Sequence, residues 1–361
     1  MHVAVTGADG FLGWHTRARL RARTGHTVVP VSRPTWQQLD DVVREADVVL
    51  HLAGVNRGAD GEVVDGNVGL AEDVAAAVRR SRRQPAVVFA NSVRAGEDTA
   101  YGAGKREAAG VLGQAAAESG SRFVDVVLPN LFGEHGRPGY NSFVATFVAA
   151  VLRGDAPEVT DREIELLHAQ AAAEVLLEAA VGTSSQVKPR GTRTTVSEVL
   201  NTLEDQYARY RTGDIPSLRS ALEVDLFNTL RAAMVGKHQP IPLVRRADER
   251  GALVETARVH GSQGQTFVST TRPGVTRGQH LHLRKVERFV VVSGRARISL
   301  RKVLSDETMH IDVTGEEPVA VDMPTMWAHN ITNTGDDDLT TIFWVNELFD
   351  PQDTDTYPED V

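Results

Sequence analysis

The spacing of hydrophobic positions changes near residue 242 and divides the chain into two parts. Before this point, short apolar runs typical of buried strands alternate with segments of roughly a dozen residues that have helical period. After it, the apolar runs are short and strand-like, and turn residues separate them. Pro240 and Pro242 stand close together where the pattern changes. We therefore predict two domains, 1–241 and 242–361.

The alternating pattern of the first part predicts an α/β fold with a Rossmann-like, doubly wound parallel sheet. We expect its strands at 2–7, 26–33, 47–54, 85–92 and 122–130. Helical period predicts helices at 11–23, 36–46, 69–81, 101–119, 141–154, 167–181, 197–213 and 218–234.

The second part predicts an all-β domain. Strand-like runs stand at 253–260, 265–274, 288–303, 317–324 and 339–349. Several short strands with turn signals between them indicate a barrel or a double-sheet roll. The acidic tail at 350–361 is expected to lie on the surface or against a partner subunit.

Composition narrows the function classes. The 361 residues, of which 41% are hydrophobic and 24% charged, are typical of a soluble protein with two domains. The formal net charge of −9 argues against a nucleic-acid partner, and the absence of cysteine excludes disulfides and Cys-based metal sites. There is no signal region and no apolar run near the ~20 residues that span a bilayer. We therefore expect a cytoplasmic enzyme without membrane contact.

A glycine-rich turn near the start predicts nucleotide binding. Gly7, Gly10 and Gly13 form a G-x-x-G-x-x-G pattern in TGADGFLG, directly after a strand and at the start of a helix. Glycine lets the backbone approach a pyrophosphate closely, and the helix amides face its charge. Phe11 and Leu12 belong to the same turn. The alternative is a tight structural turn without a ligand.

The end of the second strand favours NADP over NAD. An acidic residue at this position would bind the ribose 2′-hydroxyl of NAD. The segment VSRPTW has Ser32 and Arg33 instead, whose hydroxyl and guanidinium groups suit a 2′-phosphate. The alternative for Arg33 is a solvated loop cation.

Three residues between 92 and 105 suit proton transfer. Tyr101 and Lys105 in YGAGK have i, i+4 helical spacing and therefore share a face. A nearby ammonium favours the phenolate, so that the pair can exchange a proton near neutral pH. Ser92 ends the preceding strand and can hydrogen-bond a substrate oxygen. Each of the three, taken alone, also has an ordinary structural explanation.

Together, TGADGFLG, HLAG, Ser92 and YGAGK resemble the extended short-chain dehydrogenase/reductase family. The resemblance implies a Rossmann fold, hydride transfer with a nicotinamide, and catalytic roles for Ser92, Tyr101 and Lys105. The chain departs from the family in FANS, in the short Ser92–Tyr101 separation and in LLHAQAAAEV, where paired acids are usual. Cofactor contacts are also implied for Tyr101, Lys105 and the HLAG residues Leu52, Ala53 and Gly54.

A second group of residues, near the other end, predicts a metal site. From Gly274 the chain reads G-x5-H-x-H-x4-E-x6-G, with His280, His282 and Glu287, and His329 follows in PTMWAHNITN. Positions two apart on a strand share a face, so the first two histidines point the same way. Three imidazoles and a carboxylate suit Zn, Fe, Mn or Ni, and Zn is our first expectation.

This pattern resembles the two motifs of the cupin family, which supply these four ligands from a β-barrel. The second motif has Met326 where the family usually has glycine. The alternatives are a barrel that keeps its histidines for packing and a catalytic cupin without metal.

The order of the two parts resembles a family of bifunctional capsular-polysaccharide enzymes, and the similarity covers nearly the whole chain. It implies a UDP-linked 2-acetamido-6-deoxy-4-ketohexose as substrate, on a route of the UDP-L-FucNAc type. The cupin domain would epimerise C3 beside the ketone, and the reductase domain would then reduce the C4 ketone with NADPH. Analogy with cupins further implies a homodimer.

Several assignments stay open. The expected substrate contacts are Asn130, Arg137, Asn141 and Ser142, with helices at about 195–236 covering the pocket. The base that takes the C3 proton is open among His282, Lys285 and Glu347. Two alternatives to the bifunctional enzyme remain: a reductase whose cupin domain serves dimerisation or substrate binding, and a non-enzymatic sensor.

Overall fold

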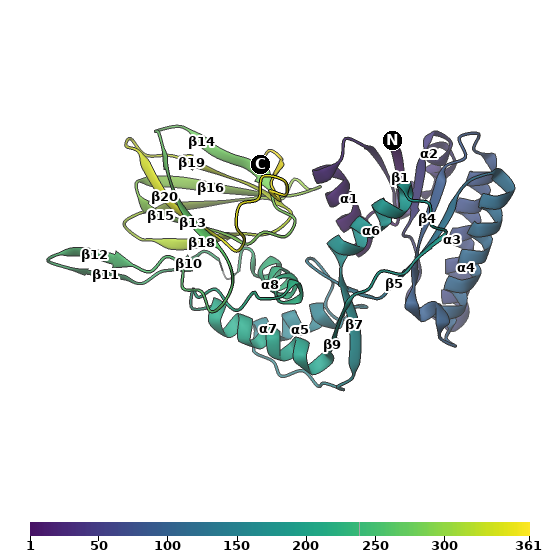
Figure 1. The fold of residues 1–361 in the computed structure, drawn as a ribbon, viewed down its shortest axis with the longest axis horizontal. Coiled ribbons are helices and arrows are strands. Elements are labelled where there is room, and N and C mark those ends of the chain that lie inside the picture. Colours follow the sequence, from purple (N-terminus) through teal and green to yellow (C-terminus); the bar gives the residue numbers. More distant parts are fainter. Residues whose placement is uncertain (238) are drawn as a thin grey trace. The chain divides into compact units, whose positions relative to one another are not determined.

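The computed structural model describes residues 1–237 and 239–361, which form two compact units (Figure 1). The first unit comprises Met1–Phe132 and Glu163–Thr194, and the second comprises Gly133–Arg162 and Thr195–Val361. The predicted division at residue 242 falls inside the second unit and stays a prediction. Among the described residues, no helix is both long and apolar enough to cross a membrane.

The first unit is built on a six-stranded parallel sheet of order β2-β1-β3-β4-β5-β8. This sheet confirms the doubly wound α/β fold expected from the alternating pattern. Its strands are β1 (His2–Thr6), β2 (Thr27–Val31), β3 (Val48–His51), β4 (Ala86–Ser92), β5 (Phe123–Leu128) and β8 (Gln186–Val187).

Helices cover both faces of this sheet. The regular helices are α1 (Phe11–Arg23), α2 (Leu39–Glu45), α3 (Asp60–Arg80), α4 (Ala100–Ser119) and α6 (Ala169–Val181), with 3-10 turns η1 (Arg33–Gln38) and η2 (Val93–Gly96). Strand β4 shows how they are divided, because its buried residues alternate between two cores. Phe89 packs with the side of α2, α3 and α4, whereas Val88 packs with the side of α1 and α6.

A small three-stranded sheet of order β6-β7-β9 completes the first unit. Its strands are β6 (Asn130–Phe132), β7 (Glu163–His168) and β9 (Thr192–Thr195). The helix predicted from residue 167 begins at Ala169, because His168 still belongs to β7 and its ring accepts a hydrogen bond from the Gln170 amide.

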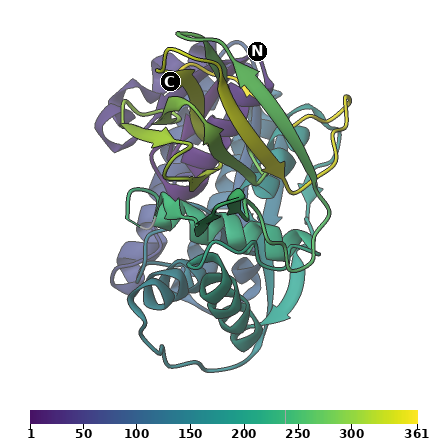
Figure 2. The ribbon, with the colours of Figure 1, turned by 90° about the vertical axis from the view of Figure 1, so that its left-hand side faces the viewer.

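The second unit contains three helices that lie on one side of its strands (Figures 1 and 2). They are α5 (Phe143–Arg153), α7 (Val196–Tyr210) and α8 (Ala221–Met234). A hydroxyl side chain caps each N-terminus, from Ser142, Thr195 and Ser220 respectively.

The remainder of the second unit is antiparallel β-structure, as the sequence predicts. One five-stranded sheet contains β10 (Ile241–Pro242), β13 (Gln265–Thr271), β15 (Glu287–Ser293), β18 (Val319–Met323) and β20 (Leu339–Val345). The other contains β14 (Thr276–Leu281), β16 (Arg295–Lys302), β17 (Thr308–Thr314), β19 (Trp327–Asn333) and β21 (Tyr357–Pro358). Side chains of both sheets, such as Phe289, Ile298 and Phe343, form one core.

Two predicted strands are wrong in extent. The run 288–303 is broken at Gly294, whose φ of +89° turns the chain, so that β15 and β16 belong to different sheets. The run 253–260 is strand only at its start, in the hairpin of β11 (Arg245–Asp248) and β12 (Gly251–Val254). This exposed hairpin has too few alternating apolar positions to be recognised from sequence.

A buried ion pair ties the helices of the second unit to its strands. Arg288 donates from Nε and Nη2 to the Asp322 carboxylate at 2.7 and 2.9 Å, and both side chains are almost fully buried. Arg288 also donates to the Gly213 carbonyl at 2.6 Å, just after α7. From α8, Arg231 donates to the Met323 carbonyl at 2.9 Å.

Candidate functional sites

The glycine-rich turn packs closely against the segment that follows β3. Gly7 has φ +65°, and a Cβ atom there would lie 2.7 Å from the Ala53 amide nitrogen. A Cβ atom on Gly13 would lie 2.1 Å from the Gly7 carbonyl oxygen, so helix α1 can begin this close to the turn only without a side chain. Gly10 is the N-cap of α1, followed by Phe11 and Leu12. The predicted cofactor residues of the turn and of HLAG therefore lie side by side.

Thr6 and His51 hold these two segments together, a role that sequence patterns did not indicate. The Thr6 hydroxyl lies 2.8 Å from His51 Nδ1 and accepts the amides of Leu52 and Ala53 at 3.2 and 3.3 Å. Burial, and then the charge of Lys105, lower the pKa of His51 to about 3. The imidazole is therefore neutral at physiological pH and serves as a fixed hydrogen-bonding group.

Ser32 and Arg33 lie where the second strand ends, as expected. Ser32 is the N-cap of η1, and its amide donates to the Thr35 hydroxyl at 2.9 Å. Arg33 is exposed at the first position of that turn. Their recognition of a 2′-phosphate stays a prediction.

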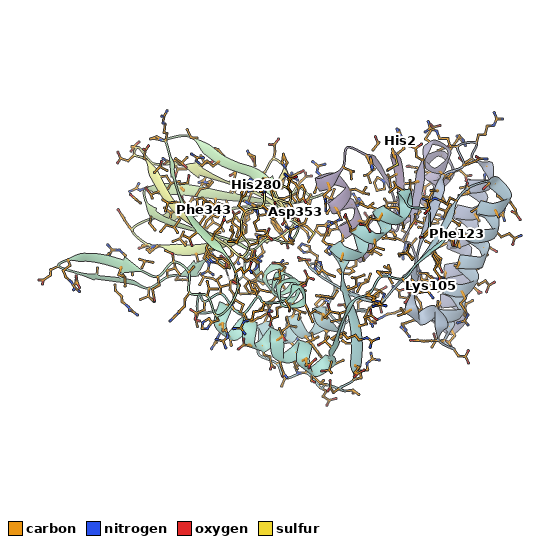
Figure 3. All side chains as sticks on the ribbon, in the orientation of Figure 1. His2, Lys105, Phe123, His280, Phe343 and Asp353 are labelled. Carbon is orange, nitrogen blue, oxygen red and sulfur yellow. The ribbon has the colours of Figure 1, made fainter. Side chains whose placement is uncertain are left out.

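Ser92, Tyr101 and Lys105 come together at the start of α4. The Ser92 side chain is close enough to the Tyr101 phenol to lower its pKa, and the Lys105 ammonium lies 6.0 Å from the centre of the Tyr101 ring. Lys105, labelled in Figure 3, donates to the Ala90 carbonyl at 2.9 Å and is 5% exposed. A Cβ atom on Gly54 would lie 3.5 Å from Lys105 Nζ, so the HLAG segment reaches the same point.

Burial is the main influence on the pKa values of Tyr101 and Lys105. It raises the pKa of Tyr101, against the opposing effects of the Ser92 hydrogen bond and the Arg94 charge. Burial also lowers the pKa of Lys105 to about 8, although Asp125 opposes this. The phenolate expected from the Tyr101–Lys105 spacing is therefore not favoured, because desolvation outweighs the effects of Ser92 and Arg94. At neutral pH the phenol is protonated and can act as a proton donor.

Two further contacts of this site had no signal in the sequence. The Arg94 guanidinium lies 5.4 Å from the centre of the Tyr101 ring and is paired with Glu97 at 2.9 Å. Asn91 donates to Asp125 at 2.8 Å and accepts from the Ser92 amide at 2.8 Å. These contacts depend on the turn η2 and on pairing of β4 with β5, which residue spacing alone does not specify.

The predicted substrate residues are divided between the two units. Asn130, in the first unit, is exposed and donates to the Glu165 carbonyl at 3.3 Å. The other three precede α5 in the second unit: Ser142 caps the helix through the Ala145 amide at 3.3 Å, and Asn141 has φ +43°. Arg137 lies 5.5 Å from the centre of the Tyr140 ring. Their contact with substrate stays a prediction.

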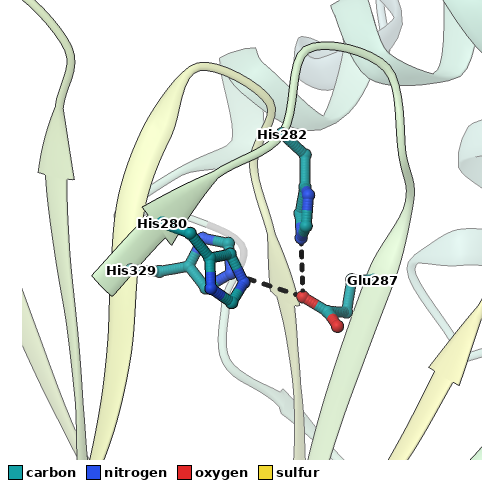
Figure 4. A group of neighbouring side chains, drawn as sticks. All are labelled: His280, His282, Glu287 and His329. Carbon is teal, nitrogen blue, oxygen red and sulfur yellow. Dashed lines mark hydrogen bonds and ion pairs between the residues drawn. The ribbon is translucent and has the colours of Figure 1, made fainter. Parts of the chain in front are cut away.

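The four predicted metal ligands form one cluster in the second unit (Figure 4). His280 lies near the end of β14, His282 follows that strand, Glu287 begins β15, and His329 is in β19. One ligand atom from each residue lies within 4.8 Å of the others. His280 is half-buried and the other three are buried, so the chain brings together all four predicted groups.

The hydrogen bonds of the histidines show that this cluster fits a cation. His282 Nδ1 lies 2.6 Å from the Asp355 carbonyl oxygen, and His329 Nδ1 lies 3.2 Å from the Trp327 carbonyl oxygen. A carbonyl only accepts, so Nδ1 is a donor in both rings, and Nε2 is the nitrogen left to bind a cation. These Nε2 atoms lie 2.9 and 3.3 Å from the same oxygen of Glu287, and that of His329 has no hydrogen-bond partner. Convergent lone pairs of this kind suit a divalent metal.

The protonation states also suit metal binding. Burial, and then the neighbouring His329 and His282, lower the pKa of His280 to about 3. Burial alone would raise the pKa of Glu287, but His282 and His329 outweigh it and hold that pKa well below its usual range. Neutral imidazoles and an ionised carboxylate are the forms that bind metals.

Met326 keeps the loop before His329 in the shape that glycine would favour. Its φ is +60°, its side chain is fully buried, and its amide donates to the His282 carbonyl at 2.7 Å. Methionine in place of the glycine that is usual in the family therefore keeps this loop hydrogen-bonded to His282.

Two of the three candidate bases for C3 have partners of their own. Lys285 Nζ donates to the Thr354 carbonyl at 2.6 Å, and Glu347 pairs with Arg284 at 3.3 Å. The third, His282, belongs to the metal cluster. The base therefore stays open.

Comparison with known proteins finds relatives along the whole chain. Residues 3–189 match the NAD dependent epimerase/dehydratase family, and residues 246–357 match the polysaccharide biosynthesis C-terminal domain. A UDP-2-acetamido-2,6-beta-L-arabino-hexul-4-ose reductase of Pseudomonas aeruginosa is 33% identical over 366 residues, which cover 99% of this chain and 98% of the relative.

Solved structures agree with this match. The capsular polysaccharide assembling protein CapF from Staphylococcus aureus is 32% identical with a TM-score of 0.62, and the alignment covers 100% of both chains. A UDP-glucose 4-epimerase from Thermotoga maritima, solved with UDP-glucose, is 17% identical with a TM-score of 0.52. That alignment covers 58% of this chain and 83% of the epimerase, and it shows a shared fold alone.

Proposed function

We propose a function on the premise that the chain belongs to the NAD dependent epimerase/dehydratase family and, within it, to the CapF-type enzymes. In coarse terms, this is a nucleotide-sugar enzyme of the reductase and epimerase type. In finer terms, the substrate is a UDP-linked 2-acetamido-6-deoxy-4-ketohexose. The second unit, as a cupin-type metal domain, epimerises C3, and the first unit reduces the C4 ketone with NADPH.

One observation carries the proposal: the first unit gathers the proton-transfer groups for the reduction, and the second gathers metal ligands that suit stabilisation of an enolate. Ser92, Tyr101 and Lys105 meet in the first unit beside Gly54, and four metal-ligand side chains meet in the second. The chemistry pairs well, because both reactions act at one ketone. Epimerisation needs the ketone to acidify the C3 proton, and reduction then removes the ketone and traps the product.

Tyr101 is the proton donor of the proposed reduction. Its phenol is held protonated by burial and can pass its proton to the ketone oxygen while a hydride reaches the carbon. Ser92, which lies beside Tyr101, can hold the same oxygen. Lys105, which donates to the Ala90 carbonyl, would bind the ribose of the cofactor. Bound NADPH would supply the hydride.

The proposed epimerisation requires stabilisation of an enolate. His280, His282, Glu287 and His329 would hold a divalent metal, with Zn as the first choice, which would supply this stabilisation as a Lewis acid. Their part is to remain deprotonated and oriented, and the carbonyl contacts of His282 and His329 serve that purpose.

Proton exchange without cofactor tests the epimerase. The full-length enzyme is given the 4-keto-6-deoxy UDP-sugar in deuterated water without NADPH, and deuterium at C3 is measured by NMR. We expect incorporation with the wild type and its loss in His280→Ala, while NADPH oxidation with an already epimerised substrate persists in that variant. No incorporation by metal-loaded wild-type protein would refute the epimerase.

A reductase without epimerase activity is the second candidate. It is favoured by the structural partners of Lys285 and Glu347, which leave C3 without an assigned base. In that case the second unit would serve dimerisation or substrate binding. NADPH oxidation without deuterium exchange is its signature.

The partners and setting follow from the same proposal. We expect a cytoplasmic homodimer that binds a UDP-sugar and has neither a nucleic-acid partner nor a membrane contact. Strand β13 supports a contact between copies, because it ends its sheet and exposes Phe267 and Val268, at 41% and 63%.

A further inference from the structure

The C-terminal segment Asp353–Val361 runs along the strand that carries the first metal ligand. Strand β21 pairs with β14, with Pro358 opposite His280 and Tyr357 opposite Leu281. The Glu359 amide donates to the Gln279 carbonyl at 3.0 Å. The segment is therefore part of the β-structure around the cluster and not a loose tail.

Asp355 occupies the centre of this contact. It is 2% exposed, and its φ of +44° is a conformation that residues other than glycine seldom adopt. Backbone strain of this size persists only where surrounding contacts impose it. Two sets of contacts at Asp355 do so.

The Asp355 carboxylate fixes the loop between two ligands. It accepts the amides of Leu283, Arg284 and Lys285 at 3.2, 2.9 and 2.8 Å. These three residues lie between His282 and Glu287 in the chain. A single buried carboxylate thus holds three successive amides, and with them the spacing between the two ligands.

The Asp355 backbone carbonyl acts on His282 itself. It accepts the His282 Nδ1 proton at 2.6 Å, which leaves Nε2 as the nitrogen that points into the cluster. His282 Nε2 in turn faces Glu287 Oε2 at 2.9 Å. Fixing the tautomer and the ring orientation of a ligand in this way commonly changes metal affinity by about 10–100-fold when it is lost.

We propose that Asp355 is a positioning residue of the metal site, and that it sets the orientation of His282 and of the 283–285 loop. The inference rests on the metal binding proposed above. Lys285 adds a second attachment of the same segment, through the Thr354 carbonyl at 2.6 Å and the Thr356 hydroxyl at 3.3 Å. Asp355 itself touches neither the metal position nor substrate in this role.

Asp355→Ala and Asp353→Ala form a matched pair that tests the proposal. Asp353 lies in the same segment but pairs with the Arg284 side chain on the surface, at 3.0 Å. We expect Asp355→Ala to bind Zn²⁺ about 10–100-fold more weakly than the wild type in a chelator competition, and Asp353→Ala to stay within about threefold. The Co²⁺-loaded protein should show a changed visible absorption spectrum in Asp355→Ala only.

Nitrogen NMR of the metal-free protein supplies a readout that a purely structural role would not move. We expect the His282 Nδ1 proton to be protected in the wild type and to exchange with solvent faster in Asp355→Ala, because loss of the carboxylate releases the segment whose backbone carbonyl accepts that proton. If Asp355→Ala does not fold, Asp355→Asn decides the matter, since it keeps the volume and one acceptor oxygen. Wild-type affinity, spectrum and Nδ1 proton exchange in a folded Asp355 variant would overturn the proposal. Failure of the wild type to bind Zn²⁺ would instead refute the proposed metal function.

Discussion

Tyr101 is the residue on which the proposed reduction depends, since it is the half-buried acid that lies beside both Ser92 and Lys105. Replacement by phenylalanine removes one oxygen and leaves the packing of α4 intact. We expect Tyr101→Phe to oxidise NADPH about 10²–10⁴-fold more slowly, with the cofactor dissociation constant little changed. Tyr207→Phe, on α7, is the control for loss of a phenol elsewhere. An unaffected rate in Tyr101→Phe would remove the residue from the mechanism.

Lys105 makes folding stability depend on pH. Its folded-state pKa is lowered from 10.5 to about 8, chiefly by burial, so the unfolded chain holds this proton more tightly between these two values. The wild type therefore carries the full free-energy cost of burying the Lys105 ammonium below pH 8. This cost is lost as pH rises toward 10.5. In nucleotide-free protein we expect Lys105→Met to be more stable by roughly 3 kcal/mol at pH 7, with the difference shrinking by pH 10.

Urea unfolding of both proteins at pH 7 and pH 10 measures this difference. Lys188→Met, which removes an exposed lysine, is the control for loss of one surface charge. A gap between wild type and Lys105→Met that is the same at both pH values would contradict the expected linkage.

At the scale of elements, the features set by local residue patterns could be predicted from the sequence, whereas those set by contacts between distant segments could not. The order of strands β1 to β5 and of the helices between them could be predicted, because burial period is a local property. Strands such as β7, β14, β17 and β19 were not among the predicted runs. The membership of both candidate sites could also be predicted, because His280 and His282, or Tyr101 and Lys105, lie a fixed spacing apart on one element. Asp355, Thr6 and Arg94 could not, because each acts across a turn or a sheet pairing that no residue spacing encodes.

The ion pair between β15 and β18 should matter more to stability than any surface pair. Asp322→Ala would leave the Arg288 guanidinium buried without its carboxylate, which costs about 3–5 kcal/mol. We expect the Asp322→Ala, Arg288→Met double variant to recover most of that loss, because it removes both charges. Denaturant unfolding measures both effects. A single variant as stable as the wild type would show that the pair is dispensable.

At the scale of the whole molecule, the two candidate sites lie in separately packed units of one chain. Light scattering tests whether two such chains associate through β13. We expect Val268→Asp to lower the measured mass to that of one chain, because it places a charge on an exposed apolar edge. Val181→Asp, at an exposed position of the first unit, should keep the wild-type mass. A monomeric wild type would refute the homodimer.

The position of Asp355 along the chain has a consequence for biosynthesis. Translation adds His280, His282, Glu287 and His329 to the growing chain before it adds Asp355. A nascent chain that already displays all four ligands would thus hold them without the group that orients His282. Tight metal capture would then begin only when the segment that carries Asp355 has folded back onto β14, so metal loading would report that synthesis has passed this point.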